Sequence, residues 1–255
     1  NINYSSTGSS LGALISVSNL NLGGGARTFT AGDTPTAAVD LTISSIVTNG
    51  TFSKAGTGTL LLTSDYAAPS GAFTIASASG SLITTGTVTS TVAQTFTNNS
   101  AASNTLLGTL DIAGKLDMGS NALTVAGSGA TRLANVASGA SANVLTGGIT
   151  LNGSAGNSLV IYAPAAGAGL GSGSSALNVP ITLTGTSPTL RLAPSLGASL
   201  SGGTTQGVYV KGYSSPTSLA TTNFLGSTSN ITAMASPFAY LNVGYGRLLT
   251  GQNFP

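Results

Sequence analysis

The sequence predicts an all-β protein built as a β-solenoid, in which short strands coil into a stack of similar turns. Three observations lead to this prediction. The composition favours strands and tight turns, apolar residues alternate with polar ones in short bursts, and one unit recurs along the chain. Almost no stretch has the apolar spacing of an amphipathic helix.

Composition separates this chain from disordered and nucleic-acid-binding proteins. Hydrophobic residues make up 41% of its 255 residues and charged residues only 5%, against a typical charged fraction of about 25%. Val, Ile, Leu and Thr are frequent, whereas disordered chains are poor in β-branched residues. The net charge is +2 and the cationic residues are scattered singly. We therefore expect no nucleic acid as a partner.

Features of the chain as a whole point to a location outside the cell. No apolar run reaches the roughly 18 residues of a membrane helix, so no membrane insertion is expected. The sequence begins at Asn1 without a signal-like segment, which is typical of a processed product. Surfaces rich in Ser, Thr, Asn and Gly and poor in charge are more common outside the cell. We expect an extracellular or bacterial cell-surface protein.

The strand signal is a motif of the form apolar-Thr-apolar. Its two apolar side chains point to one side of a strand and the threonine to the other, as in a sheet with one buried face. The motif occurs at residues 41–43, 73–75, 123–125, 149–151 and 181–183. Gly, Asn, Ser or Pro ends each burst, so the strands are short.

A longer unit recurs at residues 149–168 and 181–198, and residues 57–72 match its second half. Each copy runs strand, turn, strand, then Ala-Pro and a Gly-Ala corner. One copy is too short to bury its own apolar face, so copies must stack on one another. With about 20–25 residues a turn, the chain would form on the order of ten turns. A β-sandwich or jelly roll is the alternative.

Residues 40–82 resemble the autotransporter-associated strand repeat of bacterial passenger domains. That repeat has the form Lys-x-Gly-x-Gly-Thr-Leu-x-Leu. Its signature falls on Lys54, Gly56, Gly58, Thr59, Leu60 and Leu62. Tyr66, Gly71 and Leu82 follow in the expected order. The resemblance implies a right-handed parallel β-helix displayed on a bacterial surface. Since the chain is far shorter than typical passengers, it is either a fragment or a free-standing subunit that reuses the repeat.

The composition changes near residue 205, which divides the chain into solenoid repeats at 1–205 and a C-terminal segment at 206–255. Half of the aromatic residues lie in this C-terminal segment. The segment is either a cap on the solenoid or a surface that docks on the next subunit. The expected assembly residues are Phe238, Tyr240, Leu241, Val243, Tyr245, Leu248 and Phe254, together with Ile2 and Tyr4 near the other end.

The function expected from these features is structural: head-to-tail assembly of copies of the chain into an extracellular filament or matrix fibre. The alternative is a monomeric adhesin that binds surface glycans. No catalytic residue, cofactor or metal site is expected, because the chain has no His, Cys or Glu. Asp111 and Asp117 are two candidate carboxylates. Lys115 lies between them, so we expect an ion pair there rather than catalysis.

Two further expectations concern side chains on the outer surface of the solenoid. The pattern Thr-x-Thr recurs, as on an ice-binding face, but its irregular spacing in the sequence predicts no continuous row of threonines. Leu61, between Leu60 and Leu62, should face outward at a place where Arg191 occupies the matching position of a later repeat.

Overall fold

The computed structural model of the chain describes residues 1–5, 11–68, 73–77, 79–100, 109–134, 143–153 and 158–162, and beyond them strands only. Side chains are described within these ranges through residue 152 and at Leu159. All regular secondary structure in the described residues is strand, which confirms the predicted all-β class. No helix in this part of the chain is long and apolar enough to cross a membrane.

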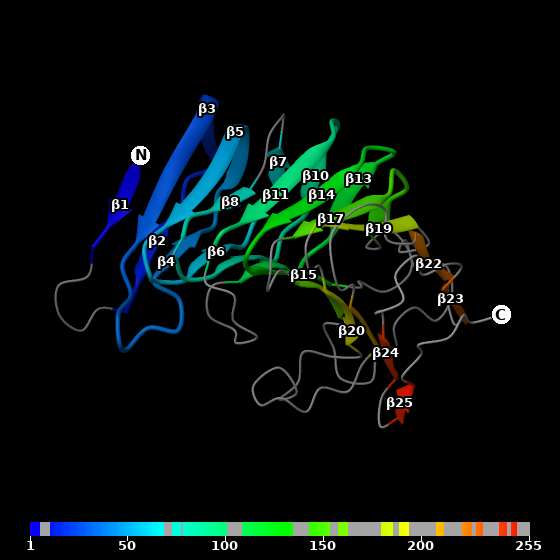
Figure 1. The fold of residues 1–255 in the computed structure, drawn as a ribbon. Coiled ribbons are helices and arrows are strands. Elements are labelled where there is room, and N and C mark those ends of the chain that lie inside the picture. Colours follow the sequence, from blue (N-terminus) through cyan, green and yellow to red (C-terminus); the bar gives the residue numbers. More distant parts are fainter. Residues whose placement is uncertain are drawn as a thin grey trace.

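The strands form two sheets that run along the molecule (Figure 1). Sheet A contains β1 (Ile2–Tyr4), β3 (Asn19–Ala31), β5 (Ile46–Ala55), β7 (Tyr66–Ala68), β8 (Phe73–Ile75), β10 (Val88–Ser90), β11 (Gln94–Asn98), β13 (Leu116–Gly119), β14 (Leu123–Gly127), β16 (Val144–Leu145), β17 (Ile149–Gly153), β19 (Pro180–Gly185), β22 (Thr221–Leu225) and β23 (Thr228–Ile231). Sheet B contains β2 (Ala13–Ile15), β4 (Leu41–Ile43), β6 (Leu60–Leu62), β9 (Leu82–Thr84), β12 (Leu110–Ile112), β15 (Ala130–Ala134), β18 (Ser158–Tyr162), β20 (Thr189–Ala193), β21 (Val208–Lys211), β24 (Tyr240–Val243) and β25 (Gly246–Leu248).

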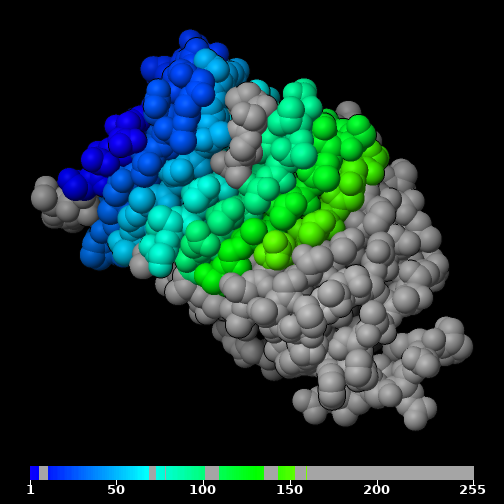
Figure 2. All heavy atoms as spheres, turned by 45° about the horizontal axis from the view of Figure 1, so that its top comes forward, coloured from blue at the N-terminus to red at the C-terminus, as the bar shows by residue number. Residues whose placement is uncertain are grey.

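Beyond β5, sheet A divides into two columns. The long strand β5 pairs with β7 near its start and with β8 near its end. The first column continues as β7, β10, β13 and β16, and the second as β8, β11, β14, β17 and β19. From β6 to β17 the chain visits sheet B, the first column and the second column in that order, so each of these turns has three strands. On the face in Figure 2 the bands of colour run from blue to yellow-green, so that successive segments of the chain lie side by side.

In the described part of the chain about five turns are stacked with parallel strands, which confirms the β-solenoid. The turns differ in length, since the register partners Leu41 and Leu60 lie much closer in sequence than the partners Leu159 and Leu190. Strands that follow β20 pair antiparallel with it and with one another. The larger number of turns expected from the sequence is therefore wrong, because register partners in adjacent turns can lie far apart in sequence and the last strands pair antiparallel.

The apolar-Thr-apolar motif behaves as predicted wherever its side chains are described. In β4, β8, β14 and β17 the two apolar side chains are buried and the threonine between them is half-buried. The fifth copy lies in β19, whose side chains are outside the described part. The recurring unit is also confirmed, since Ile149 pairs with Ile181 and Leu159 with Leu190 in adjacent turns.

Aromatic rings fill the core of the first turns. Phe29 and Phe52 stack with ring centroids 4.0 Å apart and an interplanar angle of 4°. Phe73 continues the ladder, with its centroid 5.2 Å from that of Phe96 and 5.1 Å from that of Tyr66. All five side chains are at most 2% exposed. Ring contacts therefore join successive turns, so that each turn stabilises its neighbours.

Candidate functional site

At the N-terminal end of the stack, β1 and β2 are the outermost strands of the two sheets (Figure 1). Among the described strands, β1 pairs only with β3 and β2 only with β4. Ile2, Tyr4, Ala13 and Ile15 pack against the core and are still only half-buried. We call these two strands, with Leu11 and Val17 that flank β2, the open edge, because no described turn covers them.

The open edge is apolar on its outside as well. Leu11, Leu14 and Val17 are 96%, 64% and 52% exposed, the largest exposed fractions of any large hydrophobic residue in the described chain. Neither β1 nor β2 contains a charged residue. Natural edge strands are often protected from further pairing by lysine, proline or a bulge. The two strands carry neither lysine nor proline.

The predicted assembly residues fall into two groups at opposite ends of the strand order. Ile2 and Tyr4 lie in β1, at the open edge. Tyr240, Leu241 and Val243 lie in β24 and Leu248 in β25, the last two strands of sheet B. Phe238, Tyr245 and Phe254 lie outside the described residues.

The repeat signature forms a tight corner between sheet A and sheet B. Gly56 has a φ of 77°, and a Cβ atom there would collide with the carbonyl oxygen of Ala31 in the turn below. A Cβ atom at Gly58 would lie 2.7 Å from Oδ2 of Asp40. Both positions therefore require glycine. Leu60 and Leu62, which follow the corner, are buried as predicted.

Asp40 binds the polar groups of this corner from the preceding turn. The backbone N–H and the hydroxyl of Thr34 donate to its Oδ1 at 2.7 and 2.8 Å, and the backbone N–H of Thr59 donates to its Oδ2 at 2.7 Å. Asp40 is 1% exposed. The conformation of this corner thus depends on a buried carboxylate that satisfies three donors.

Lys54, the first residue of the signature, is fully buried. Its Nζ donates hydrogen bonds to the carbonyl oxygens of Ala55 at 2.8 Å and Gly56 at 2.6 Å. Burial lowers the pKa of Lys54 to about 8, and the negative charge of Asp40 offsets part of this effect. Lys54 therefore binds the carbonyl oxygens of the corner from inside the fold. The residue types around it do not predict that a charged side chain is buried there.

Stability should change with pH because of Lys54. Its pKa is about 8 in the fold, below the ordinary value of 10.5, so between these values the unfolded chain binds more protons. The free energy of unfolding should therefore rise by roughly 3 kcal/mol as pH increases through this interval. Urea unfolding across this range measures the rise, and Lys54→Met should abolish it.

Tyr66 should change the free energy of unfolding with pH in the opposite direction, and it serves as the control. Burial raises its pKa above the usual 10.0, and its hydroxyl donates to the carbonyl oxygen of Gly50 at 2.7 Å. Above the usual tyrosine pKa the unfolded chain loses this proton first, so stability should fall there. Tyr66→Phe should remove the fall in stability at high pH and keep the rise in stability that Lys54 causes. A flat profile in the wild-type protein would contradict the buried charge of Lys54.

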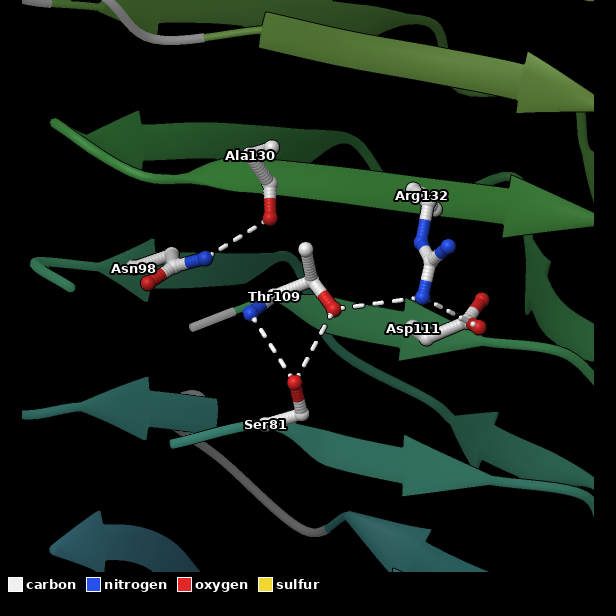
Figure 3. Close-up of polar contacts among 6 residues, drawn as sticks. All are labelled: Ser81, Asn98, Thr109, Asp111, Ala130 and Arg132. Carbon is white, nitrogen blue, oxygen red and sulfur yellow. Dashed lines mark hydrogen bonds and ion pairs between the residues drawn. The ribbon is translucent and has the colours of Figure 1, made fainter. Parts of the chain in front are cut away.

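A buried polar cluster lies on the outer side of sheet B (Figure 3). Nη2 of Arg132 lies 2.8 Å from Oδ2 of Asp111 and donates to the hydroxyl of Thr109 at 3.2 Å. Ser81 bonds to Thr109 from the next strand at 3.3 Å. The Arg132 and Asp111 side chains are 5% and 6% exposed, and Nε and Nη1 of Arg132 have no hydrogen-bond partner within the described chain.

The structure separates the two carboxylates that were candidates for joint chemistry. Asp111 lies in sheet B and Asp117 in the first column of sheet A. Asp117 forms the predicted ion pair with Lys115, at 3.0 Å. The described residues include no group of three or more His, Cys, Asp or Glu side chains that would hold a metal ion.

Leu61 faces outward as predicted, but it is half-buried. Its neighbours in the same register row are Thr42 and Ile83. The row continues from strand to strand across sheet B and reaches Arg191. The predicted correspondence between Leu61 and Arg191 is therefore confirmed.

No protein-family model matches the chain, and neither a curated protein nor a solved structure is similar to it. The parallel solenoid agrees with the fold that the repeat signature implies.

Proposed function

We propose that the chain is a structural subunit that assembles head to tail, so that the solenoid of one copy continues into the next. The observation that carries this proposal is the open edge, with its half-buried core residues and exposed Leu11, Leu14 and Val17. Covering this apolar surface would contribute a favourable free energy to association. The proposal includes a location outside the cell, as for the autotransporter passengers that the repeat resembles.

The two ends of the strand order favour a head-to-tail contact. The open edge presents β1 and β2, while β23 and β25 are the last strands of sheets A and B. Each end thus offers one edge of each sheet. A contact between two different surfaces of identical copies does not close on itself and produces a filament.

The backbone of β2 indicates where strand addition would occur. The N–H of Ala13 donates to the carbonyl oxygen of Asp40, and the carbonyl oxygen of Ile15 accepts from the N–H of Ser44. Residues 13 and 15 therefore direct their backbone groups towards β4. Leu14, between them, directs its N–H and C=O towards the open side.

Substitution of Leu14 tests the proposal. Leu14→Pro removes the free N–H without removing an existing ladder bond, and proline is tolerated on edge strands. Leu14→Thr is the matched control, since it keeps the N–H. We expect wild-type protein to form concentration-dependent filaments in electron microscopy and sedimentation. Leu14→Thr should still form them, at a higher protein concentration, because it keeps the N–H and loses part of the apolar surface. Leu14→Pro should remain as single copies.

Three outcomes would contradict head-to-tail assembly. Wild-type particles that stay monodisperse at every concentration would exclude self-assembly. Growth that stops at dimers would indicate two open edges paired with each other. Filaments of Leu14→Pro equal to wild type would show that strand addition at β2 is not the contact.

A further inference from the structure

The outer side of the second column of sheet A carries threonines in continuous rows. Thr95, Thr124, Thr150 and Thr182 are register partners on the consecutive strands β11, β14, β17 and β19. Every position of this row is therefore threonine over four strands. The expectation that no continuous row forms is wrong. The four threonines are unevenly spaced in the sequence, which conceals the row, although their strands are in register.

A second row of hydroxyl groups ends on the strand where the first begins. Thr28, Ser53, Thr74 and Thr97 are register partners on β3, β5, β8 and β11. The rows meet on β11, where Thr95 and Thr97 lie on the same side of the strand. We call Thr74, Thr95, Thr97, Thr124 and Thr150 the threonine face.

The hydroxyls of the threonine face are available to solvent. Thr95 is exposed and the other four are half-buried, as expected for side chains flanked by neighbours in a sheet. Within the described chain, none of these five hydroxyls forms a hydrogen bond to another protein group. The other outward-facing residues of β14 and β17 include Ala126 and Asn152, and none of those on β11, β14 and β17 is charged or aromatic.

The geometry of the sheet sets the spacing between these hydroxyls, along the rows and between Thr95 and Thr97 on β11. Neighbouring strands of a sheet lie about 4.8 Å apart, and alternate residues of one strand are separated by about 6.7 Å. Each hydroxyl can donate one hydrogen bond and accept two. The β-branched side chain restricts χ1, so the hydroxyls and methyl groups hold fixed positions. The five hydroxyls thus lie on points of a two-dimensional lattice, in which Ala126 and Asn152 continue the second row on β14 and β17.

We propose that the threonine face binds ice. The ligand is crystalline water, because only a ligand that repeats on this length scale in two dimensions would engage every hydroxyl at once. Bridging water molecules form hydrogen bonds nearly as favourable as direct ones, and a rigid array sums many of them over one surface. The lack of aromatic side chains disfavours sugar stacking, and the lack of charge disfavours an ionic ligand.

This inference does not depend on assembly, because a single copy contains the complete threonine face. If copies do stack head to tail, the rows would continue along the filament axis and enlarge the face. The experiment therefore uses conditions in which the protein is a single copy, so that failure of assembly and failure of ice binding are separate results.

The test compares substitutions on and off the threonine face. Thr124→Lys places a long charged side chain in the centre of the all-threonine row. Thr95→Lys does so at the exposed position beside it and is a second variant in case the first fails to fold. The control is Thr89→Lys, because Thr89 is exposed on β10 in the first column. Surface changes of this kind alter stability only by about 0.5 kcal/mol.

The measurements are thermal hysteresis and incorporation into slowly grown ice. Wild-type protein and Thr89→Lys should depress the freezing point and enter the ice, whereas Thr124→Lys and Thr95→Lys should lose both properties. Wild-type protein that is rejected from ice and shows no hysteresis would overturn the proposal. So would equal losses in all three variants, or binding to insoluble cellulose or chitin without any ice activity.

Discussion

Phe73→Ala should lower the free energy of unfolding by about 3–5 kcal/mol, the usual cost of removing a buried aromatic ring. Phe73 is 1% exposed and contacts aromatic rings in three directions. Its ring centroid lies 6.5 Å from that of Phe52, 5.1 Å from that of Tyr66 and 5.2 Å from that of Phe96. The substitution therefore leaves a cavity at the centre of the ladder and removes three ring contacts.

The loss should be transmitted to neighbouring turns, because a solenoid is stabilised mainly by contacts between adjacent repeats. Urea unfolding gives the change in stability, and hydrogen exchange should show faster opening on both sides of β8. Phe73→Leu preserves most of the volume and should cost less than about 1.5 kcal/mol. Thr74→Ala, on the outer side of the same strand, is the matched control. If Phe73→Ala cost no more than Thr74→Ala, the ladder would not stabilise the stack.

Much of the fold could be predicted from local sequence pattern. The apolar-Thr-apolar strands bury the side chains that alternation assigns to the core. The two copies of the longer unit align in register because their strands have the same pattern, as the pair Ile149 and Ile181 shows. The glycines of the repeat signature, Gly56 and Gly58, lie at a tight corner where a side chain would not fit.

Features that depend on how the turns stack could not be predicted from local sequence pattern. The sequence spacing between Thr95, Thr124 and Thr150 is uneven although the three residues are register partners, so the row is regular only in space. The aromatic ladder had a usable signal, because Phe29, Phe52, Phe73 and Phe96 recur at nearly equal intervals along the sequence. Those intervals match the number of residues in the shorter turns.

Buried charge was the least predictable feature, because charged residues are usually exposed unless paired. Lys54 is buried because it follows the inward alternation of β5, where Phe52 and Lys54 face the core. Asp40 has its partners in other segments, at Thr34 and Thr59. Nothing local in the sequence indicates these contacts.

Arg132→Met should destabilise the fold by about 3–5 kcal/mol, the cost of breaking a buried ion pair by removal of one partner. Asp111 and Arg132 are register partners on β12 and β15, and both side chains are almost completely buried. The substitution leaves the Asp111 carboxylate buried without its guanidinium partner. Urea unfolding measures the loss, with Thr89→Ala on an exposed strand position as the control.

The double variant Asp111→Leu with Arg132→Met should be at least as stable as wild type, and more stable by up to about 4 kcal/mol, because it removes the desolvation cost of both charges. That cost is high here, since Nε and Nη1 of Arg132 are buried without hydrogen-bond partners in the described chain. The single variants and the double variant form a thermodynamic cycle, which should show strong non-additivity. Additive losses in the double variant would mean that the two side chains stabilise the sheet independently, through packing rather than through their pairing.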